Sequence, residues 1–205
     1  SNNTGVEDNK IYGKLWNGST WGSRENISSS IVNSTDFQMF SALGYENDIY
    51  VVFYSKDNNI KFIKRTWGVG WGSEENVRLN SLDDDSCPAL IIDQSTGNAW
   101  VFWQEGENIY YRNRKSDGIW DNITYWFTEG ENLVPRPTIG TSGNVYDGKL
   151  LIYYNTHSSA PYKIKFAYID LGNDHLLVDN CVAGNDNLVT CLLYTSDAAD
   201  EEDSV

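Results

Sequence analysis

The sequence lacks any window with a sustained helical period, and it lacks an apolar run of about 18 residues that could cross a membrane as a helix. Cysteine is scarce, with three residues in a chain of 205, and no Cys-x-x-Cys pair or other metal-like spacing occurs. Basic residues are also few: the chain contains 15 Lys and Arg but 29 Asp and Glu, which gives a net charge of −14. Such an acidic chain repels phosphate backbones. These shortages argue against a helical fold, insertion into a membrane, a disulfide framework and a nucleic-acid partner.

Aromatic residues are abundant, and parts of the sequence recur with a fixed period. The chain contains eight Trp and 13 Tyr, which suits stacked sheets whose faces carry large, flat side chains. Ile11, Ile60 and Ile109 are spaced 49 residues apart, and Ile164 follows 55 residues later. The spacing of 49 is also kept by Met39, Pro88 and Pro137. A period of about 40–50 residues indicates a propeller, a solenoid or another repeat array.

Each period contains four short segments that are typical of β-strands, and in the second copy these are residues 37–44, 49–55, 60–66 and 71–78. The run Val51–Tyr54 is apolar, β-branched and aromatic, which is typical of a strand buried on both faces. Asn, Asp and Gly separate the segments, and these residues tolerate the left-handed backbone of tight hairpins. We therefore predict an all-β fold, an incomplete β-propeller of four-stranded antiparallel blades, with about three and a half blades in this chain.

The repeat divides the chain into segments. We predict a disordered N-terminal edge over residues 1–10, a half-blade over 11–27, blades over 37–79, 86–127 and 136–180, and a truncated or artefactual tail over 181–205. Within the tail, Cys191–Glu201 reads CLLYTSDAADE and resembles the translated end of a sequencing-library adapter, as would suit a metagenomic fragment. Propellers close with about four to eight blades, so we expect the natural protein to contain further blades.

The turns between third and fourth strands carry a motif. Its three copies are WNGSTW over residues 16–21, TWGVGW over 66–71 and KSDGIW over 115–120. With the Glu-Asn-hydrophobic step that follows, and a next strand that begins near Pro, they resemble the BNR or Asp-box repeats of sialidase-like propellers over nearly all of residues 11–170. The Asp-box pattern is Ser-x-Asp-x-Gly-x-Thr-Trp, which the third copy matches with compressed spacing and the first only at its Gly-x-Thr-Trp end. The resemblance implies that a turn carboxylate or amide binds backbone donors and that the Trp packs between blades.

The tryptophans near these turns fall into two groups. Trp21, Trp71 and Trp120 lie 10 or 11 residues after their repeat starts, and we predict that they pack between blades. Trp16 and Trp67 are less periodic, and we predict that they are exposed. An exposed indole can stack on the apolar C–H face of a sugar, although scattered surface aromatics are also common. Trp16 and Trp67 are therefore candidate ligand-binding residues.

Arg136 is a third candidate ligand-binding residue, on the basis of the same resemblance. Sialidases carry an Arg before a Pro in a corresponding place, where the guanidinium binds the substrate carboxylate. Here the sequence reads Pro135-Arg136-Pro137 instead of Arg-Ile-Pro, and the aligned positions in the earlier repeats are Gln38 and Cys87. A sialidase site needs three arginines, so a surface ion pair is the competing interpretation of Arg136.

The loop over residues 155–163 carries most of a six-residue insertion in the last repeat. Loops that break a repeat often carry its specificity, so His157 and Tyr162 are the last two candidate ligand-binding residues. A solvent-exposed His without an orienting partner is the competing interpretation of His157. The run Asp83–Asp85 could bind a hard cation but lacks the Asp-x-Asp-x-Asp-Gly spacing, so we predict neither a metal site nor a cofactor.

Three functions are compatible with these features. We favour a non-catalytic, extracellular or cell-surface propeller that binds glycans or cell-surface partners, because aromatics are abundant and no complete catalytic set is present. The alternative is a sialidase-like exo-glycosidase fragment whose active site is incomplete here, since hydrolysis needs two facing acids or a Tyr with an acid partner. The third is a structural or adhesion repeat. Several acids could share one face by chance, namely Asp85, Glu105, Glu107 and Glu129. We assign no catalytic residue, and enzymatic activity stays open.

Overall fold

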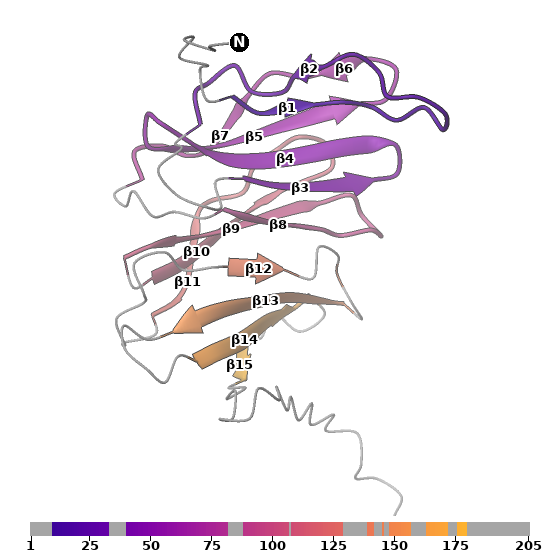
Figure 1. The fold of residues 1–205 in the computed structure, drawn as a ribbon. Coiled ribbons are helices and arrows are strands. Elements are labelled where there is room, and N and C mark those ends of the chain that lie inside the picture. The colour runs from indigo at the N-terminus through magenta and orange to yellow at the C-terminus, as the bar shows by residue number, and fades with distance from the viewer. Residues whose placement is uncertain are drawn as a thin grey trace, which may run out of the picture.

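The computed structural model describes residues 10–32, 40–81, 88–106, 108–128, 139–141, 145, 148–156, 163–171 and 176–179. The strands in these residues pair with antiparallel neighbours, and the resulting sheets are stacked in a row that follows the chain from the N-terminal side (Figure 1). The described part of the chain holds no helix long and apolar enough to cross a membrane. The chain is thus all-β, as the strand pattern of its sequence predicts.

The sheets correspond to one half-blade and three blades of an incomplete propeller. The half-blade contains β1 (Tyr12–Gly13) and β2 (Glu25–Asn26). The second blade contains β3 (Phe40–Tyr45), β4 (Asp48–Ser55), β5 (Asn59–Thr66), β6 (Gly70–Trp71) and β7 (Glu75–Arg78). The third blade contains β8 (Ala89–Ile92), β9 (Ala99–Glu105), β10 (Asn108–Arg114) and β11 (Thr124–Thr128). The fourth blade contains β12 (Ile139–Thr141), β13 (Lys149–Thr156), β14 (Lys163–Asp170) and β15 (Leu176–Asp179).

One predicted strand is divided in the structure. The segment over residues 71–78 forms β6 and β7, which both pair with β5 on its outer side. Between them the chain leaves the regular ladder, and the Gly72 N–H donates to the Lys64 carbonyl at 2.9 Å. The same step recurs in the third blade, where the Asp121 N–H donates to the Asn113 carbonyl at 2.9 Å. The outer strand therefore consists of a short piece next to the hairpin and a longer main piece. The hydrophobic pattern of the sequence does not predict this division.

The hydrophobic core lies between the sheets, because both faces of each inner blade are covered. The run Val51–Tyr54 in β4 is fully buried, which confirms the prediction of a strand covered on both faces. One core cluster joins the second blade to the half-blade and the third blade, and includes Phe62 and Trp103. A second cluster joins the third and fourth blades, and includes Phe102 and Trp126. The core is therefore built at the interfaces between blades.

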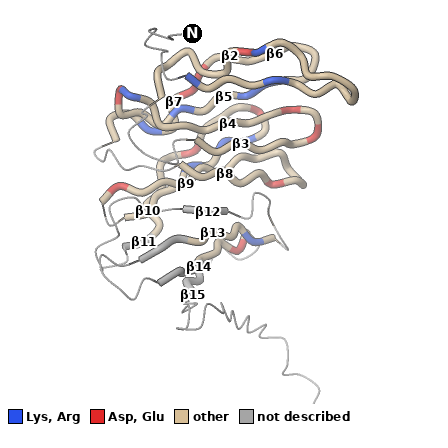
Figure 2. Tube along the Cα trace, viewed as in Figure 1, with Lys and Arg blue, Asp and Glu red and all other residues tan. Residues whose placement is uncertain are grey.

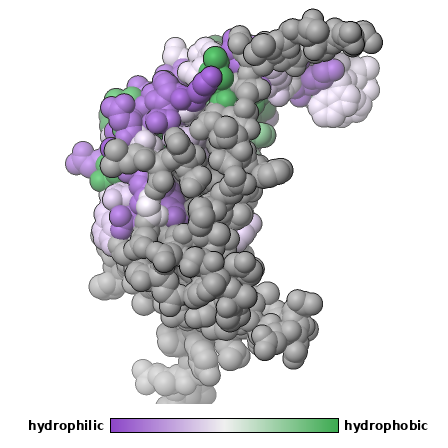
Figure 3. Space-filling view, turned by 60° about the vertical axis from the view of Figure 1, so that its left-hand side comes forward, coloured by the Kyte–Doolittle hydropathy of each residue, from purple (hydrophilic) through white to green (hydrophobic). Residues whose placement is uncertain are grey.

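Antiparallel strands place alternate hairpins at opposite ends of each blade. The ends of β4, β9 and β13 lie at one end of the blades, together with the starts of β5, β10 and β14 and the ends of β7 and β11, and we call this the mouth edge. The hairpins between third and fourth strands lie at the other end, which we call the hairpin edge; those of β1–β2 and β5–β6 project to the right in Figure 1. Lys, Arg, Asp and Glu are interspersed along the described strands (Figure 2). In the view of Figure 3, much of the described surface is hydrophilic, and hydrophobic residues appear as small separate spots.

Candidate functional site

The structure describes two of the five candidate ligand-binding residues. Trp16 and Trp67 both belong to hairpins between a third and a fourth strand, and they therefore lie on the hairpin edge. Arg136, His157 and Tyr162 lie outside the described residues, so their ligand roles stay predictions. Both described candidates therefore lie on the hairpin edge.

Side chains of the turn hold these hairpins in shape. In the half-blade, the Asn17 Oδ1 accepts hydrogen bonds from the N–H groups of Ser19 at 2.9 Å and Thr20 at 2.8 Å. In the third blade, the Asp117 Oδ1 accepts one from the Ile119 N–H at 3.0 Å. An amide or carboxylate oxygen in the turn thus binds backbone donors, as the resemblance to Asp-box repeats implies.

Trp67 begins the turn of the second blade, and the residue is 62% exposed. Its backbone N–H donates to the Asp48 Oδ1 at 2.9 Å, and Asp48 also forms an ion pair with Lys64 at 2.7 Å. The third blade repeats this anchor, because the Ser116 N–H donates to the Asn98 Oδ1 at 3.0 Å. The backbone that carries the exposed indole is therefore tied to the start of the neighbouring strand.

Exposed apolar side chains gather on the hairpin edge of three successive blades. The set comprises Trp16, Trp21, Trp67, Val69 and Ile119, which we call the apolar edge. Trp16 is 51% exposed, and its ring contacts that of Trp21 with centroids 5.4 Å apart and planes tilted by 54°. The exposure predicted for Trp16 and Trp67 is confirmed. Single exposed apolar residues are common, whereas a group of them on one edge marks a candidate interaction surface.

Trp71 packs between blades through a carboxylate contact that we call the interblade clamp. The Glu25 carboxylate of β2 accepts hydrogen bonds from Arg65 of β5, with Nε–Oε2 at 3.0 Å and Nη2–Oε1 at 3.2 Å. The same Oε2 accepts the Trp71 Nε1–H at 2.8 Å. The Arg65 side chain is only 11% exposed. The clamp therefore joins the half-blade to the second blade by two parallel charge-assisted bonds and one indole bond.

The same clamp recurs between the second and third blades. The Glu75 carboxylate of β7 accepts two hydrogen bonds from Arg114 of β10, both at 2.8 Å, and one from the Trp120 Nε1 at 2.7 Å. The prediction that Trp71 and Trp120 pack between blades is thus confirmed, since both also contact the core. The clamp is not repeated between the third and fourth blades. There Thr124 occupies the register position of the clamp glutamate, and Ile169 that of the clamp arginine.

The prediction for Trp21 is wrong, because this residue is 64% exposed. Trp21 faces Trp16 across its hairpin, as Trp71 faces Arg65 across the next one. Trp21 therefore has the position of a clamp tryptophan, but no described residue on the N-terminal side of the half-blade supplies a carboxylate.

The sequence contains a signal for the clamp that a survey of aromatic residues misses. Glu25 and Glu75 belong to matching Glu-Asn-hydrophobic steps 50 residues apart, and Arg65 and Arg114 are 49 apart. A carboxylate and an arginine that both follow the repeat indicate a contact at each repeat boundary. The spacing does not say which blades they join, because that depends on the stacking of the sheets.

At the mouth edge, Glu105 is bound by its neighbours. Its carboxylate pairs with Arg78 of the second blade, with Nε–Oε1 at 2.7 Å, and accepts the Trp103 Nε1–H at 2.9 Å. The three other acids considered for hydrolysis lie outside the described residues, namely Asp85, Glu107 and Glu129. Within the described residues no group of three or more His, Cys, Asp or Glu is arranged to hold a metal ion. Glu105 therefore joins two blades, which is a structural role.

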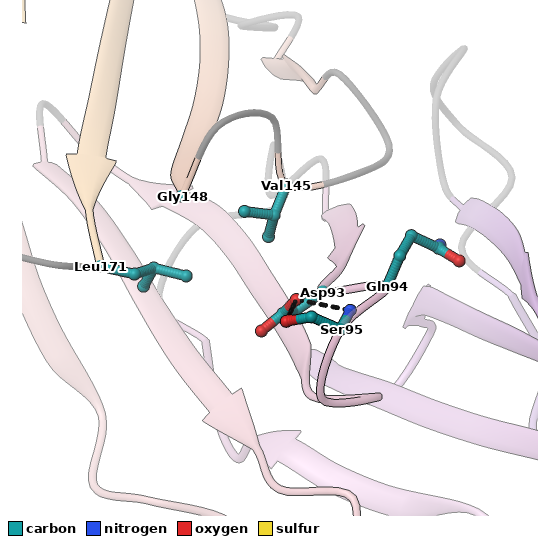
Figure 4. A pocket seen from close by; sticks show the side chains of 6 residues that line it. All are labelled: Asp93, Gln94, Ser95, Val145, Gly148 and Leu171. Atoms are coloured by element: carbon teal, nitrogen blue, oxygen red, sulfur yellow. Dashed lines mark hydrogen bonds between the residues drawn. The ribbon is translucent and has the colours of Figure 1, made fainter.

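A pocket of about 420 Å³ lies between the third and fourth blades. Figure 4 shows Val145 and Leu171 on one side of it, and Asp93 and Ser95 on the other. The Asp93 Oδ1 accepts the N–H and the hydroxyl of Ser95 at 2.9 and 2.7 Å, and its Oδ2 accepts the Thr96 hydroxyl at 2.5 Å. The carboxylate is thus used to shape the turn after β8, which does not favour the pocket as a catalytic site.

Hydrogen bonds to carboxylates lower several pKa values. The pKa of Glu25 lies below its ordinary value, chiefly because Arg65 donates to the charged carboxylate. In four other groups burial by itself would raise the pKa, but donors to the carboxylate outweigh it and lower the pKa; these are Asp48, Asp57, Glu74 and Asp93. In Glu74, the donors are Ser30 and Ser29 of the preceding half-blade.

We expect stability to fall steeply in acid. Each of these carboxyl groups has a lower pKa in the folded chain, so its stabilisation is complete above its ordinary value, 3.8 for Asp and 4.5 for Glu. That stabilisation is lost as the pH falls through the folded pKa values, because the unfolded chain then binds more protons. The urea midpoint should be nearly constant around neutral pH and decline below about pH 5. Glu25→Gln should reduce the decline, and a constant midpoint down to about pH 3 would contradict this account.

No protein-family model and no curated protein matches this sequence. Among solved structures, the chain is similar to a mutant of NanB sialidase from Streptococcus pneumoniae, with a TM-score of 0.50 and 14% identity over 79% of this chain and 26% of that one. It is also similar to an alpha-L-arabinofuranosidase from Clostridium thermocellum, with a TM-score of 0.48 and 16% identity over 74% of this chain and 54% of that one. A third similar structure is an endo-arabinase from Bacteroides thetaiotaomicron, with a TM-score of 0.47 and 15% identity over 88% of this chain and 75% of that one.

The comparison with the sialidase supports the fold. The match covers 79% of this chain at 14% identity, which bears on the fold and not on the roles of residues. The chain spans about a quarter of the length of that sialidase, since the match covers 26% of it. The fold is therefore that of an incomplete β-propeller.

Proposed function

We propose that this chain is part of a non-catalytic, extracellular β-propeller that binds glycans through its hairpin edge. The observation that carries the proposal is the apolar edge, where indoles and aliphatic side chains of three successive blades face solvent. Apolar groups gathered in this way cost free energy unless a partner covers them. The strongly acidic chain, with a net charge of −14, keeps phosphate-rich partners away.

Trp67 is the best platform for a sugar on this edge. Its backbone is anchored by Asp48, so the indole is presented from a fixed hairpin. The turn beyond it contains Gly68 and Gly70, and a Cβ on either would meet no described atom within 4 Å. A flat ligand can therefore approach the backbone beside the ring. A rigid aromatic side chain gives contact area at low conformational cost, which suits the apolar face of a sugar ring.

The non-catalytic part of the proposal is supported by the roles of the described acids. Glycoside hydrolysis needs a pair of carboxyl groups on either side of the bond, or a Tyr nucleophile with an acid partner. Glu105 and Asp93 are instead held by hydrogen bonds that join blades or shape a turn. The shared fold with a sialidase is compatible with a glycan ligand whether or not a reaction follows.

The test is a glycan array probed with the 205-residue chain, followed by titration of the best ligand. We expect Trp67→Ala to weaken binding about tenfold or more, because loss of a stacked ring removes about 1.4 kcal/mol or more. Trp16→Ala tests the second indole in the same assay. Phe40→Ala is the control, since Phe40 is also exposed but begins β3 at the mouth edge.

Two outcomes would overturn the proposal. If the array shows no ligand, the structural or adhesion alternative replaces it. If the chain hydrolyses a fluorogenic sialoside, the exo-glycosidase alternative replaces its non-catalytic part, and Arg136→Ala should then abolish the turnover because that guanidinium would hold the substrate carboxylate.

A further inference from the structure

A tyrosine ring closes the interface between the second and third blades at the hairpin edge. Tyr45, the last residue of β3, is half-buried and packs against the core cluster of these blades. A Cβ on Gly97, in the turn before β9, would lie 2.9 Å from the Tyr45 Cε1. The Tyr50 ring lies beside that of Tyr45, with centroids 6.4 Å apart and planes at 67°. Tyr45 therefore fills the space between the ends of these two blades.

The third blade has no aromatic residue in the place of Tyr45. Tyr45 lies opposite Asp48 in the ladder, and the Asp93 N–H donates to the Asn98 carbonyl at 2.9 Å. Asp48 and Asn98 correspond, because each side chain accepts a hydrogen bond from the backbone of the following hairpin. Asp93 therefore has the position of Tyr45, with a much smaller side chain.

The space next to Asp93 is the pocket of about 420 Å³ between the third and fourth blades. Its lining includes Gly148, in the turn before β13. Gly97 and Gly148 share a left-handed backbone, with φ of 73° and 69°. A Cβ on Gly148, however, would meet no described atom within 4 Å, whereas one on Gly97 would meet Tyr45. The hollow that a tyrosine fills at one interface is thus open at the next, and its volume is in the range of small-molecule sites, about 300–1,000 Å³.

The two sides of this pocket differ in chemistry. Val145 and Leu171 point into it from the fourth blade, and both also pack against the second core cluster (Figure 4). On the other side, the Asp93 carboxylate accepts two hydrogen bonds from Ser95 and one from Thr96. A carboxylate has about four acceptor sites, so one remains for a further donor. The pocket thus combines an apolar wall with one open acceptor.

We propose that this pocket binds a neutral aromatic ring that carries a hydroxyl, which is the chemistry of the tyrosine at the preceding interface. The ring packs on Val145 and Leu171, and its hydroxyl donates to the Asp93 carboxylate. A ligand with its own carboxylate or phosphate is repelled by Asp93. Two sources offer such a ring, namely a free phenol and the tyrosine side chain of a peptide.

The proposal is independent of glycan binding, because it uses no residue of the apolar edge. The probe is p-cresol, the tyrosine side chain without its backbone, titrated into the 205-residue chain and followed by saturation-transfer NMR. We expect saturable binding. If no saturable binding occurs up to the solubility limit of p-cresol, the proposal is overturned.

A series of ligands tests the role of Asp93 without altering the turn that it shapes. The methyl ether of p-cresol has the same ring but no donor, and it should bind about tenfold more weakly, because the bond to a charged acceptor is lost. The anion p-methylbenzoate should not bind. Equal binding of all three would indicate unspecific apolar contact and would contradict the proposal. N-acetyl-tyrosinamide separates the two sources, since tighter binding than p-cresol assigns the pocket to a peptide, and equal or weaker binding assigns it to a free phenol.

Substitutions in the apolar wall locate the bound ring. Val145→Phe places a ring in the pocket and should abolish binding of p-cresol, and Leu171→Ala should weaken it about tenfold through lost apolar contact. Leu79→Ala is the matched control, because the same side chain is removed from an exposed site at the mouth edge, and it should bind like the unmodified chain. Circular dichroism checks that each variant is folded. If folded Val145→Phe binds p-cresol as the unmodified chain does, the ring lies elsewhere and the proposal fails.

Discussion

Replacing Trp103 with alanine should lower the free energy of unfolding by about 3–5 kcal/mol. Trp103 is completely buried between the second and third blades, where its ring stacks on that of Tyr110 with centroids 6.0 Å apart and planes 16° apart. Its Nε1–H also donates to Glu105 at 2.9 Å. The substitution thus removes a large apolar volume, a ring stack and a hydrogen bond from one interface.

The measurement is urea denaturation followed by circular dichroism, which does not depend on the lost fluorophore. Trp67→Ala is the matched control, because the same side chain is removed from an exposed site and the expected change is below about 0.5 kcal/mol. A loss of less than about 1 kcal/mol for Trp103→Ala would contradict the packing of these two blades.

The second large effect should come from the interblade clamp. Glu75→Ala should cost about 2 kcal/mol, because it leaves the largely buried guanidinium of Arg114 without its carboxylate. The Arg114 side chain is 12% exposed and also lies 5.1 Å from the centre of the Phe62 ring, so it cannot move freely into water. The carboxylate itself is 30% exposed, which keeps the expected loss below that of a fully buried pair.

A double-mutant cycle with Arg114→Met isolates the pair, since Met keeps much of the apolar stem. The coupling energy should be about 1 kcal/mol or more. The ion pair between Lys115 and Asp121, with side chains 51% and 46% exposed, provides a matched control. Its cycle should give a coupling below about 0.5 kcal/mol. A similarly small value for Glu75 and Arg114 would show that the clamp does not hold the blades together.

The sequence predicts the hairpins well because their geometry is local. Asn17 and Asp117 close turns with donors two or three residues away, so their role follows from the turn motif alone. The exposure of Trp67 at a hairpin tip is likewise set by its neighbours in the chain. Trp21 differs, because the burial of a clamp tryptophan depends on a carboxylate of a neighbouring sheet, and that contact is not a property of the local segment.

The sequence by itself determined the strands, the repeat and the order of the blades, because alternation, turn residues and a period of 49 are properties of short segments. Only the tertiary structure decided which carboxylate meets which arginine. Glu25 and Arg65 are 40 residues apart and meet only when one sheet stacks on the next. It also decided that Glu105 is held by Arg78 of the neighbouring blade, since that contact depends on the distance between the sheets and not on the sequence within either of them.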